Sequence, residues 1–271
     1  MDLWIIESVD NNNPIIHLSS NPDLKRLFDV IHEDADLLVI NKPAGLVCHP
    51  TKTDEYSSLI SRVRLYLGDK TRPHLINRLD RETSGVTTVA KQDDAARELR
   101  RLWETRLVKK EYLAIVHGHV QSNEGVIDAP LGKDEQSHVA IKDRVRSDGL
   151  PSQTEYEVVR YFQHSSLAAG ARSNADFTLL RVRPLTGRKH QIRIHLAHIS
   201  HPIVGDKLYG GDEDLYLALV EDRLTTEQKA QLMLPHHALH AAVVRFNWRD
   251  RAVEFGCEPE PWFAAFAAEQ T

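Results

Sequence analysis

Apolar residues in the first part of the chain fall in short runs between polar turns, a pattern typical of β-strands. Residues 28–50 (FDVIHEDADLLVINKPAGLVCHP) predict one strand, an acidic turn and a second strand at 37–40, which a Lys-Pro-Ala-Gly turn ends. Farther along, two β-rich runs at 75–79 and 86–90 flank a turn rich in Asp, Thr, Ser and Gly. This pattern places Asp80 at the end of a strand, facing a loop.

A helical period appears directly after this unit. Ala95, Leu99, Leu102 and Trp103 recur at the spacing of an amphipathic helix, and Asp93 or Asp94 is expected as its N-cap.

Four more runs predict strands, most of which follow one another without an intervening helix. Residues 111–116 (EYLAIV) are apolar on both alternating faces, as in a strand that is covered on both sides of a sheet. Three further strands are expected at 154–161, 177–182 and 241–246, the first two joined by a loop that contains SSLAAGARSNAD. We therefore expect an α+β fold with a mixed, mostly antiparallel central sheet and flanking helices.

A second helix carries a candidate binding feature. A strand is expected to end at Pro184, followed by a Thr-Gly-Arg turn and a helix that stops before His201 and Pro202, with an apolar stripe formed by Ile192, Leu196 and Ile199. Arg188 and Lys189 would open this helix, where free amides and two cations form a natural anion site, with phosphate as the obvious anion.

Composition and charge narrow the class of protein. With 271 residues, 41% hydrophobic and 27% charged, the chain is typical of a globular protein, and we expect a catalytic domain at 28–271 after an N-terminal extension at 1–27. Cys48 and Cys257 lie far apart without metal-site spacing, and no apolar run approaches the roughly 20 residues of a spanning helix. These features favour a cytoplasmic protein without disulfides or membrane contact.

The net charge of -5 argues against a surface that is positive all over. Basic residues nevertheless gather at 97–110 and 179–195. Without further motifs, these segments would be interpreted as the solvated faces of an ordinary enzyme.

Five segments in fixed order change that interpretation: INKPAGLVCHP (40–50), NRLDRETSGV (77–86), KKEYLAIVHG (109–118), PLTGRKHQIRIHLAHISHPIVGDKLYG (184–210) and ALHA (238–241). Together they resemble the RluA-type family of RNA pseudouridine synthases. The resemblance implies the pseudouridine synthase fold and an enzyme that isomerises specific uridines of ribosomal or transfer RNA. The basic, helical composition of the S4-like RNA-binding domain found in some members is missing before Phe28, so we expect no such domain.

Carried over residue by residue, the resemblance implies that Asp80 is the nucleophile, Tyr112 the active-site tyrosine and Arg193 the basic partner of the aspartate. Arg78 resembles the arginine that fills the space left by the flipped uridine. Asn77 stands where many members carry histidine, which puts a base-contacting side chain at that position in doubt.

The reaction explains why these residue types are needed. The N1–C1′ bond of uridine breaks, the uracil turns, and C5 bonds to C1′, so no electrons or groups are gained. We therefore expect no cofactor and no metal. An ionised carboxylate beside the sugar would act as nucleophile or stabilise positive charge at C1′, and the nucleotide would have to be flipped out of its stack. Structured RNA is the expected partner, with no DNA, and the protein is expected to be a monomer.

Each assignment has a plainer alternative. Asp80 could be a turn residue, Tyr112 a core tyrosine and Arg193 a surface ion-pair residue. Histidines at 190–201 and 236–240 invite a zinc interpretation, but neither HExxH nor a cysteine pair accompanies them. Two other functions stay open: a glycosidase or nucleosidase with Glu82 or Glu111 as its acid, and a non-catalytic RNA-binding protein on a synthase scaffold.

Overall fold

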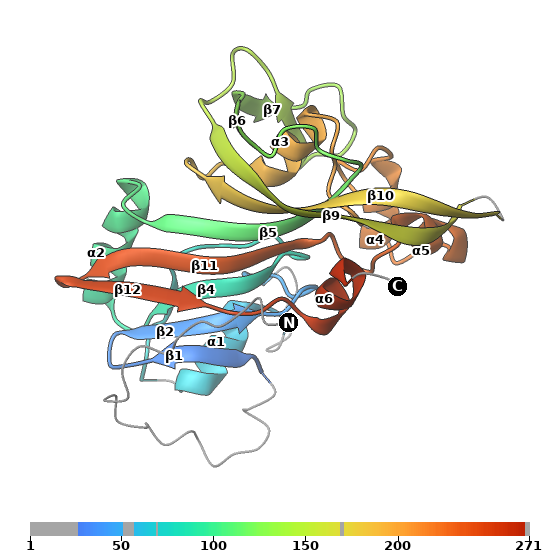
Figure 1. Ribbon diagram of the computed structural model, residues 1–271. Helices are drawn as coiled ribbons and strands as arrows, with labels where there is room; N and C mark the ends of the chain where they lie inside the picture. The colour runs from blue at the N-terminus through green and yellow to red at the C-terminus, as the bar shows by residue number, and fades with distance from the viewer. Residues whose placement is uncertain (1–26, 51–56, 69, 169–170, 269–271) are drawn as a thin grey trace.

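The computed structural model describes residues 27–50, 57–68, 70–168 and 171–268. Its framework is a ten-stranded sheet in the order β1-β2-β4-β11-β5-β10-β9-β6, with β12 added on β11 and β3 on β4 (Figure 1). The strands of this sheet are β1 Asp29–Glu33, β2 Leu37–Lys42, β3 His74–Leu75, β4 Ser84–Ala90, β5 Lys109–His117, β6 Glu124–Asp128, β9 Gln153–Ala168, β10 Ala171–Pro184, β11 Leu239–Trp248 and β12 Arg251–Gly256.

Shorter elements complete the fold. A separate two-stranded sheet joins β7 to β8, and helices lie beside the large sheet and at its ends (Figure 1). Their bounds are β7 Leu131–Lys133, β8 Asp143–Val145, α1 Leu59–Leu67, α2 Asp93–Glu104, α3 Gln191–His198, α4 Asp214–Val220, α5 Thr226–Leu232 and α6 Pro261–Ala267.

The sheet is mixed, with antiparallel pairing in the majority. Among the described strands, β4 and β11 pair in parallel, through His240 opposite Ser84 and Ala241 opposite Gly85. The other pairings are antiparallel. The expected α+β class is confirmed.

Apolar burial explains why the helices attach where they do. One hydrophobic cluster joins β5, β10, α3 and α6, a second joins β2, β4, β11 and α2, and a third covers α1. On β5 the four residues from Leu113 to Val116 are all buried, as the apolar pattern of both faces predicted. Every residue of α3 from Gln191 to Leu196 is buried too, so this helix is held rigidly against the sheet.

Three local predictions were wrong. The strand expected at 75–79 ends at Leu75, because the Asn77 side chain takes over the pairing: its Oδ1 accepts from Thr88 N at 2.7 Å and its Nδ2 donates to Val86 O at 3.2 Å. Asp80 therefore lies within a loop. The N-cap of α2 is Gln92, and Asp93 and Asp94 occupy the first turn, where their charge favours the helix dipole.

The third wrong prediction is the loop expected at SSLAAGARSNAD. Antiparallel pairing between β9 and β10 continues from Thr154 opposite Pro184 as far as Ala168 opposite Ala171. The segment is thus the distal part of a long hairpin (Figure 1). The predicted N-terminal extension lies outside the described residues except for Leu27, and the proposed domain boundary stays a prediction.

Candidate active site

A pocket of about 520 Å³ opens where four distant parts of the sequence meet. Most of its wall comes from residues 47–49, the loop at 76–83, the beginning of β5 and the connection from β10 into α3, and Trp103 and Leu239 complete it. All six residues singled out from the sequence line it: Arg78, Asp80, Tyr112, Arg188, Lys189 and Arg193.

The loop that carries Asp80 is held by side chains of the preceding segment instead of by strand pairing. Cys48 Sγ contacts both the amide and the carbonyl of Leu79, at 3.4 and 3.3 Å. The fully buried Lys42 donates to the carbonyl of Arg81 at 3.1 Å, and Thr83 N donates to the carbonyl of Asp80 at 3.2 Å. The backbone on both sides of Asp80 is therefore fixed.

Arg193 joins two carboxylates. Its Nη1 donates to Asp80 Oδ2 at 2.8 Å, while Nε and Nη2 grip Asp206 at 2.7 and 2.9 Å. Asp206 also accepts the backbone amides of Leu208 and Tyr209, at 2.9 and 3.0 Å. Both oxygens of Asp206 thus accept hydrogen bonds, and each nitrogen of the Arg193 guanidinium donates one, which favours a buried ion pair.

The electrostatics keep Asp80 ionised. Burial acts to raise the pKa of Asp80, but the charge and hydrogen bond of Arg193, together with the weaker effects of neighbouring side chains, outweigh burial and hold the pKa below its usual value. The Asp80 side chain keeps 28% of its surface exposed, so the carboxylate faces the pocket. It is a charged oxygen group available to a bound molecule.

Tyr112 projects from β5 into the same pocket, half-buried. Burial and then the charge of Asp80 raise the pKa of its hydroxyl well above the ordinary value, so the phenol stays protonated. An apolar ring with a protonated hydroxyl can pack on a planar group and donate a hydrogen bond.

The expected anion site at Arg188 and Lys189 needs correction. The helix begins at Gln191, after His190 in a left-handed conformation, so the two cations precede it. The Arg188 amide donates to the Gln191 side chain at 3.0 Å, and Lys189 forms an ion pair with Asp143 at 2.9 Å. Arg188 contacts the Pro151 carbonyl at 3.5 Å, which leaves most of its donors for a ligand. Arg78 is exposed at the pocket wall.

Asp206 and Tyr209 were not singled out from the sequence, while Glu82 and His190 were considered only as a glycosidase acid and as a metal ligand. Glu82 is 9% exposed and pairs with Lys207 at 2.9 Å. His190 and Asp206 stand inside the segment 184–210 that carried the resemblance, but nothing in their spacing indicates partners. An acid among apolar residues, as in IVGDKL, was the available signal for Asp206.

Several of the histidines that invited a zinc interpretation contact protein groups. His195 contacts Thr154 Oγ1 and the Ala129 carbonyl, and His237 contacts Thr83 Oγ1 at 2.7 Å. Within the described ranges, no three His, Cys, Asp or Glu side chains converge as metal ligands. None of the helices described combines the length and apolar character that crossing a bilayer requires.

Comparison with known proteins identifies the family. Residues 36–198 match the RNA pseudouridylate synthase family. An uncharacterized RNA pseudouridine synthase of Bacillus subtilis is 33% identical over 225 residues, which cover 81% of this chain and 64% of that protein. A second one, of Aquifex aeolicus, is 30% identical over 88% of this chain and 72% of its own length. Ribosomal large subunit pseudouridine synthase C of Pasteurella multocida is 36% identical over 80% of this chain and 60% of that protein.

Solved structures agree with the sequence relatives. Human RNA pseudouridylate synthase domain containing 1 superimposes with a TM-score of 0.64 at 26% identity, covering 88% of this chain and 85% of that one. Fold and pocket together define a protein of the pseudouridine synthase class. The chain belongs to the RNA pseudouridylate synthase family, and the RluA-type resemblance is confirmed. It spans less than two thirds of the length of the Bacillus and Pasteurella relatives.

Proposed function

We propose that this chain is an RNA pseudouridine synthase in which Asp80 is the catalytic nucleophile. The observation that carries the proposal is the Asp80 carboxylate, held ionised by Arg193 at 2.8 Å in a pocket of about 520 Å³. A pocket of this size can enclose a flipped nucleotide.

In the proposed reaction, Asp80 attacks or stabilises C1′ as the N1–C1′ bond breaks. The detached uracil turns, C5 bonds to C1′, the C5 hydrogen leaves to solvent and N1 takes up a proton. Tyr112 packs on the base and its protonated hydroxyl can move a proton. Arg78, exposed at the wall, fills the space that the flipped uridine leaves in the RNA.

The glycosidase alternative lacks a suitable acid in this geometry. Glu82 is buried against Lys207, and although burial acts to raise its pKa, hydrogen bonds and charges from His236, His237 and Lys207 lower it to about 2, so it stays ionised. Glu111 pairs with Arg181 and Arg183 at 3.2 and 3.1 Å. A general acid needs a raised pKa, which the surroundings of Glu82 do not provide, and the Glu111 carboxylate is already engaged by two arginines.

We propose ribosomal RNA as the first substrate to test, with transfer RNA second. Synthase C of Pasteurella multocida and synthase D of Escherichia coli are named for the large ribosomal subunit. We also propose that the protein is cytoplasmic and monomeric and has no DNA or membrane partner; the cysteine spacing and the lack of a long apolar run support the location.

Pseudouridine mapping of total RNA from cells with and without the gene tests the function. The proposal expects at least one ribosomal or transfer RNA position that is pseudouridine with the gene and uridine without it. Mass spectrometry of purified RNA treated with the protein should show unchanged RNA mass and no free uracil. Release of uracil would favour the nucleosidase, and an unchanged map with intact RNA would favour the non-catalytic binder.

A further inference from the structure

His190 occupies a strained position beside Asp80 and has no part in the mechanism proposed so far. It precedes α3 with φ at 54°, in the left-handed region, and its side chain is 9% exposed at the pocket wall. Its Nε2 lies 3.8 Å from Asp80 Oδ1, and its Nδ1 lies 2.9 Å from the Tyr209 hydroxyl. Non-glycine residues adopt this backbone conformation at a cost that the surrounding structure has to offset.

The hydroxyl of Tyr209 determines which nitrogen of His190 carries the proton. The Asp143 amide donates to this hydroxyl at 3.3 Å, so the oxygen already accepts one hydrogen bond. Its own proton needs an acceptor, and among the described residues His190 Nδ1 is the group within reach. Tyr209 therefore donates to Nδ1, which leaves the proton of a neutral imidazole on Nε2.

The surroundings keep the ring neutral. Burial lowers the pKa of His190 to about 4. The negative charges of Asp80 and Asp206 act to raise this pKa, and the positive charges of Arg193 and Lys189 act to lower it. The Tyr209 hydrogen bond also favours the neutral ring, because it engages the nitrogen as an acceptor. At neutral pH the site thus contains a fixed, uncharged N–H facing Asp80 Oδ1.

Building on the proposed function, we propose that His190 is a positioning residue for Asp80, held by Tyr209 in the Nε2–H form so that it orients Oδ1 while Arg193 holds Oδ2. A neutral donor sets the rotation of the carboxylate without adding a second positive charge that would neutralise the nucleophile. Two donors, one on each oxygen, define the plane of the carboxylate relative to the bound sugar.

The 3.8 Å separation fits a donor that engages during binding. It exceeds the length of a hydrogen bond, yet it is shorter than the roughly 5 Å that a bridging water would need, given about 2.8 Å for each of its bonds. Catalytic hydrogen bonds are often long before substrate enters and shorten in the complex.

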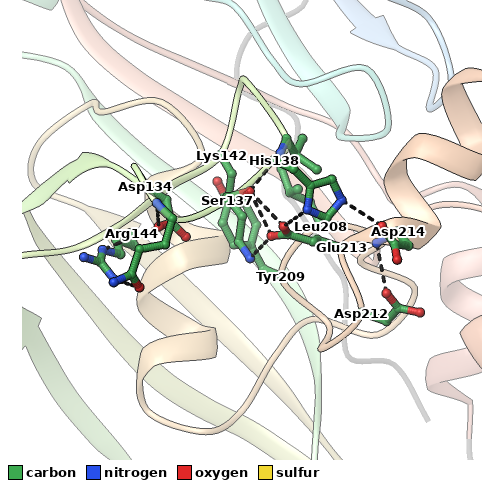
Figure 2. A network of polar contacts seen from close by, with 12 residues as sticks. Asp134, Ser137, His138, Lys142, Arg144, Leu208, Tyr209, Asp212, Glu213 and Asp214 are labelled. Atoms are coloured by element: carbon green, nitrogen blue, oxygen red, sulfur yellow. Dashed lines mark hydrogen bonds and ion pairs between the residues drawn. The ribbon is translucent and has the colours of Figure 1, made fainter.

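A polar cluster on the far side of Tyr209 secures the Asp143 amide. Glu213 binds Ser137 at 2.9 and 3.0 Å and His138 at 3.0 Å, and it also binds Lys142 (Figure 2). These contacts connect the segment around β8 to the segment after Tyr209. His138 also contacts Asp214 at 2.7 Å. Both partners of the Tyr209 hydroxyl are therefore anchored, His190 at the N-cap of α3 and Asp143 beside this cluster.

The tautomer can be measured directly. A long-range proton–nitrogen correlation spectrum of the full chain with labelled histidine, with His190 assigned through His190→Asn, should show the proton on Nε2 at pH 7. Tyr209→Phe keeps the ring that packs on Arg193 and removes the hydroxyl, so it should give a mixture of the two neutral forms. A proton on Nδ1 in the parent would overturn the inference, whether or not the chain is a synthase.

Kinetics test the positioning role. With ribosomal RNA as substrate, Tyr209→Phe should lower kcat about tenfold, the effect of one lost hydrogen bond, with RNA affinity unchanged. The acid limb of its pH profile should move to higher pH, because the pKa of His190 rises when the donor to its neutral form is lost. Tyr161→Phe is the matched control. Tyr161 lies on β9, outside the pocket, and its hydroxyl donates to the Val120 carbonyl at 2.8 Å. This variant should have the kcat and the pH profile of the parent.

A Tyr209→Phe protein with parental kcat and a parental acid limb would contradict the positioning role. A parent protein that makes no pseudouridine would overturn the proposed function and the role that depends on it, while the spectrum would still report the tautomer.

Discussion

At the scale of single residues, the buried guanidinium of Arg193 is the centre of the site. Its Nη1 reaches Asp80 because Asp206 fixes the opposite edge through two hydrogen bonds. The Asp206 side chain is fully buried and the Arg193 side chain is 7% exposed, so both charges depend on each other for compensation. Removing one member of such a pair leaves an uncompensated buried charge.

Asp206→Asn should therefore destabilise the protein by about 3 kcal/mol at pH 7. Burial acts to raise the pKa of Asp206, but the charge and hydrogen bonds of Arg193, together with the Leu208 amide, outweigh burial and hold the pKa well below its ordinary value. Its stabilisation is thus present above about pH 4, the ordinary pKa of aspartate, and is lost as the pH falls below it. Urea unfolding of the parent and of Asp206→Asn measures this effect. The difference between their free energies of unfolding should be smaller at pH 3 than at pH 7.

Glu98→Gln provides the control for this measurement. Glu98 pairs with Arg249 at 3.1 Å with both side chains nearly half exposed, so its loss should cost less than about 1 kcal/mol. Equal, small effects of the two variants would mean that Asp206 does not compensate Arg193.

The sequence predicted some of these residues and not others. Asp80, Tyr112 and Arg193 stand in motifs whose letters carry the resemblance, and the structure brings all three into one pocket. Asp206 and Tyr209 were missed, and His190 was considered only as a metal ligand, because what matters for all three is a contact that only the folded chain creates. Asp206 follows Arg193 by 13 positions, a spacing that no helix or strand period would connect.

At the scale of elements, the loop of Asp80 is fixed at its far end by the parallel pairing of β4 with β11. Gly85 lies in this pairing with φ at 112°, and a Cβ placed there would meet the Ala241 carbonyl oxygen at 2.2 Å. Backbone atoms of a central strand cannot move aside easily. The close approach therefore requires glycine.

Gly85→Ala should destabilise the protein by about 2 kcal/mol more than Gly68→Ala. Gly68 also has a positive φ, of 75°, but a Cβ there would meet nothing within 4 Å, so it reports the backbone strain alone. Thermal or urea unfolding measures the difference. Equal costs for the two substitutions would show that β4 can separate from β11 freely.

Helices and strands were predicted well where apolar periodicity was strong. They were predicted poorly where hydrogen bonds to other parts of the chain determine whether a segment forms a strand. The strands at 154–161 and 177–182 were predicted, but the distal part of the β9–β10 hairpin between them was taken for a loop, since Gly, Ser and Asn interrupt the apolar pattern there. Conversely, the apolar letters of 75–79 suggested a strand that the Asn77 side chain replaces with its own hydrogen bonds.

At the scale of the whole molecule, an acidic chain has to present a local positive surface to bind RNA. Arg188 and Lys189 lie side by side at the pocket, yet Asp143 neutralises Lys189 at 2.9 Å, whereas Arg188 contacts a carbonyl oxygen at 3.5 Å. The two cations should therefore contribute unequally to RNA binding.

Arg188→Gln should make the dependence of log K on log salt shallower by roughly 0.7 to 0.9, as expected for one lost phosphate contact. Lys189→Gln should change the slope less, and turnover at saturating RNA should change little in either variant. Filter binding across a salt series separates the two. A larger change of slope in Lys189→Gln than in Arg188→Gln would mean that RNA displaces Asp143 from Lys189. Parental slopes in both variants would mean that the positive RNA-binding surface lies elsewhere, along residues 97–110.

The central claim is that the Asp80 carboxylate performs the isomerisation, and release of tritium from RNA labelled at C5 of uridine measures it most directly, since C5 loses its hydrogen when it bonds to C1′. Asp80→Asn is nearly isosteric and removes the charge. It should abolish tritium release in single-turnover assays, while circular dichroism and RNA affinity stay close to those of the parent. Turnover within about tenfold of the parent would contradict the account.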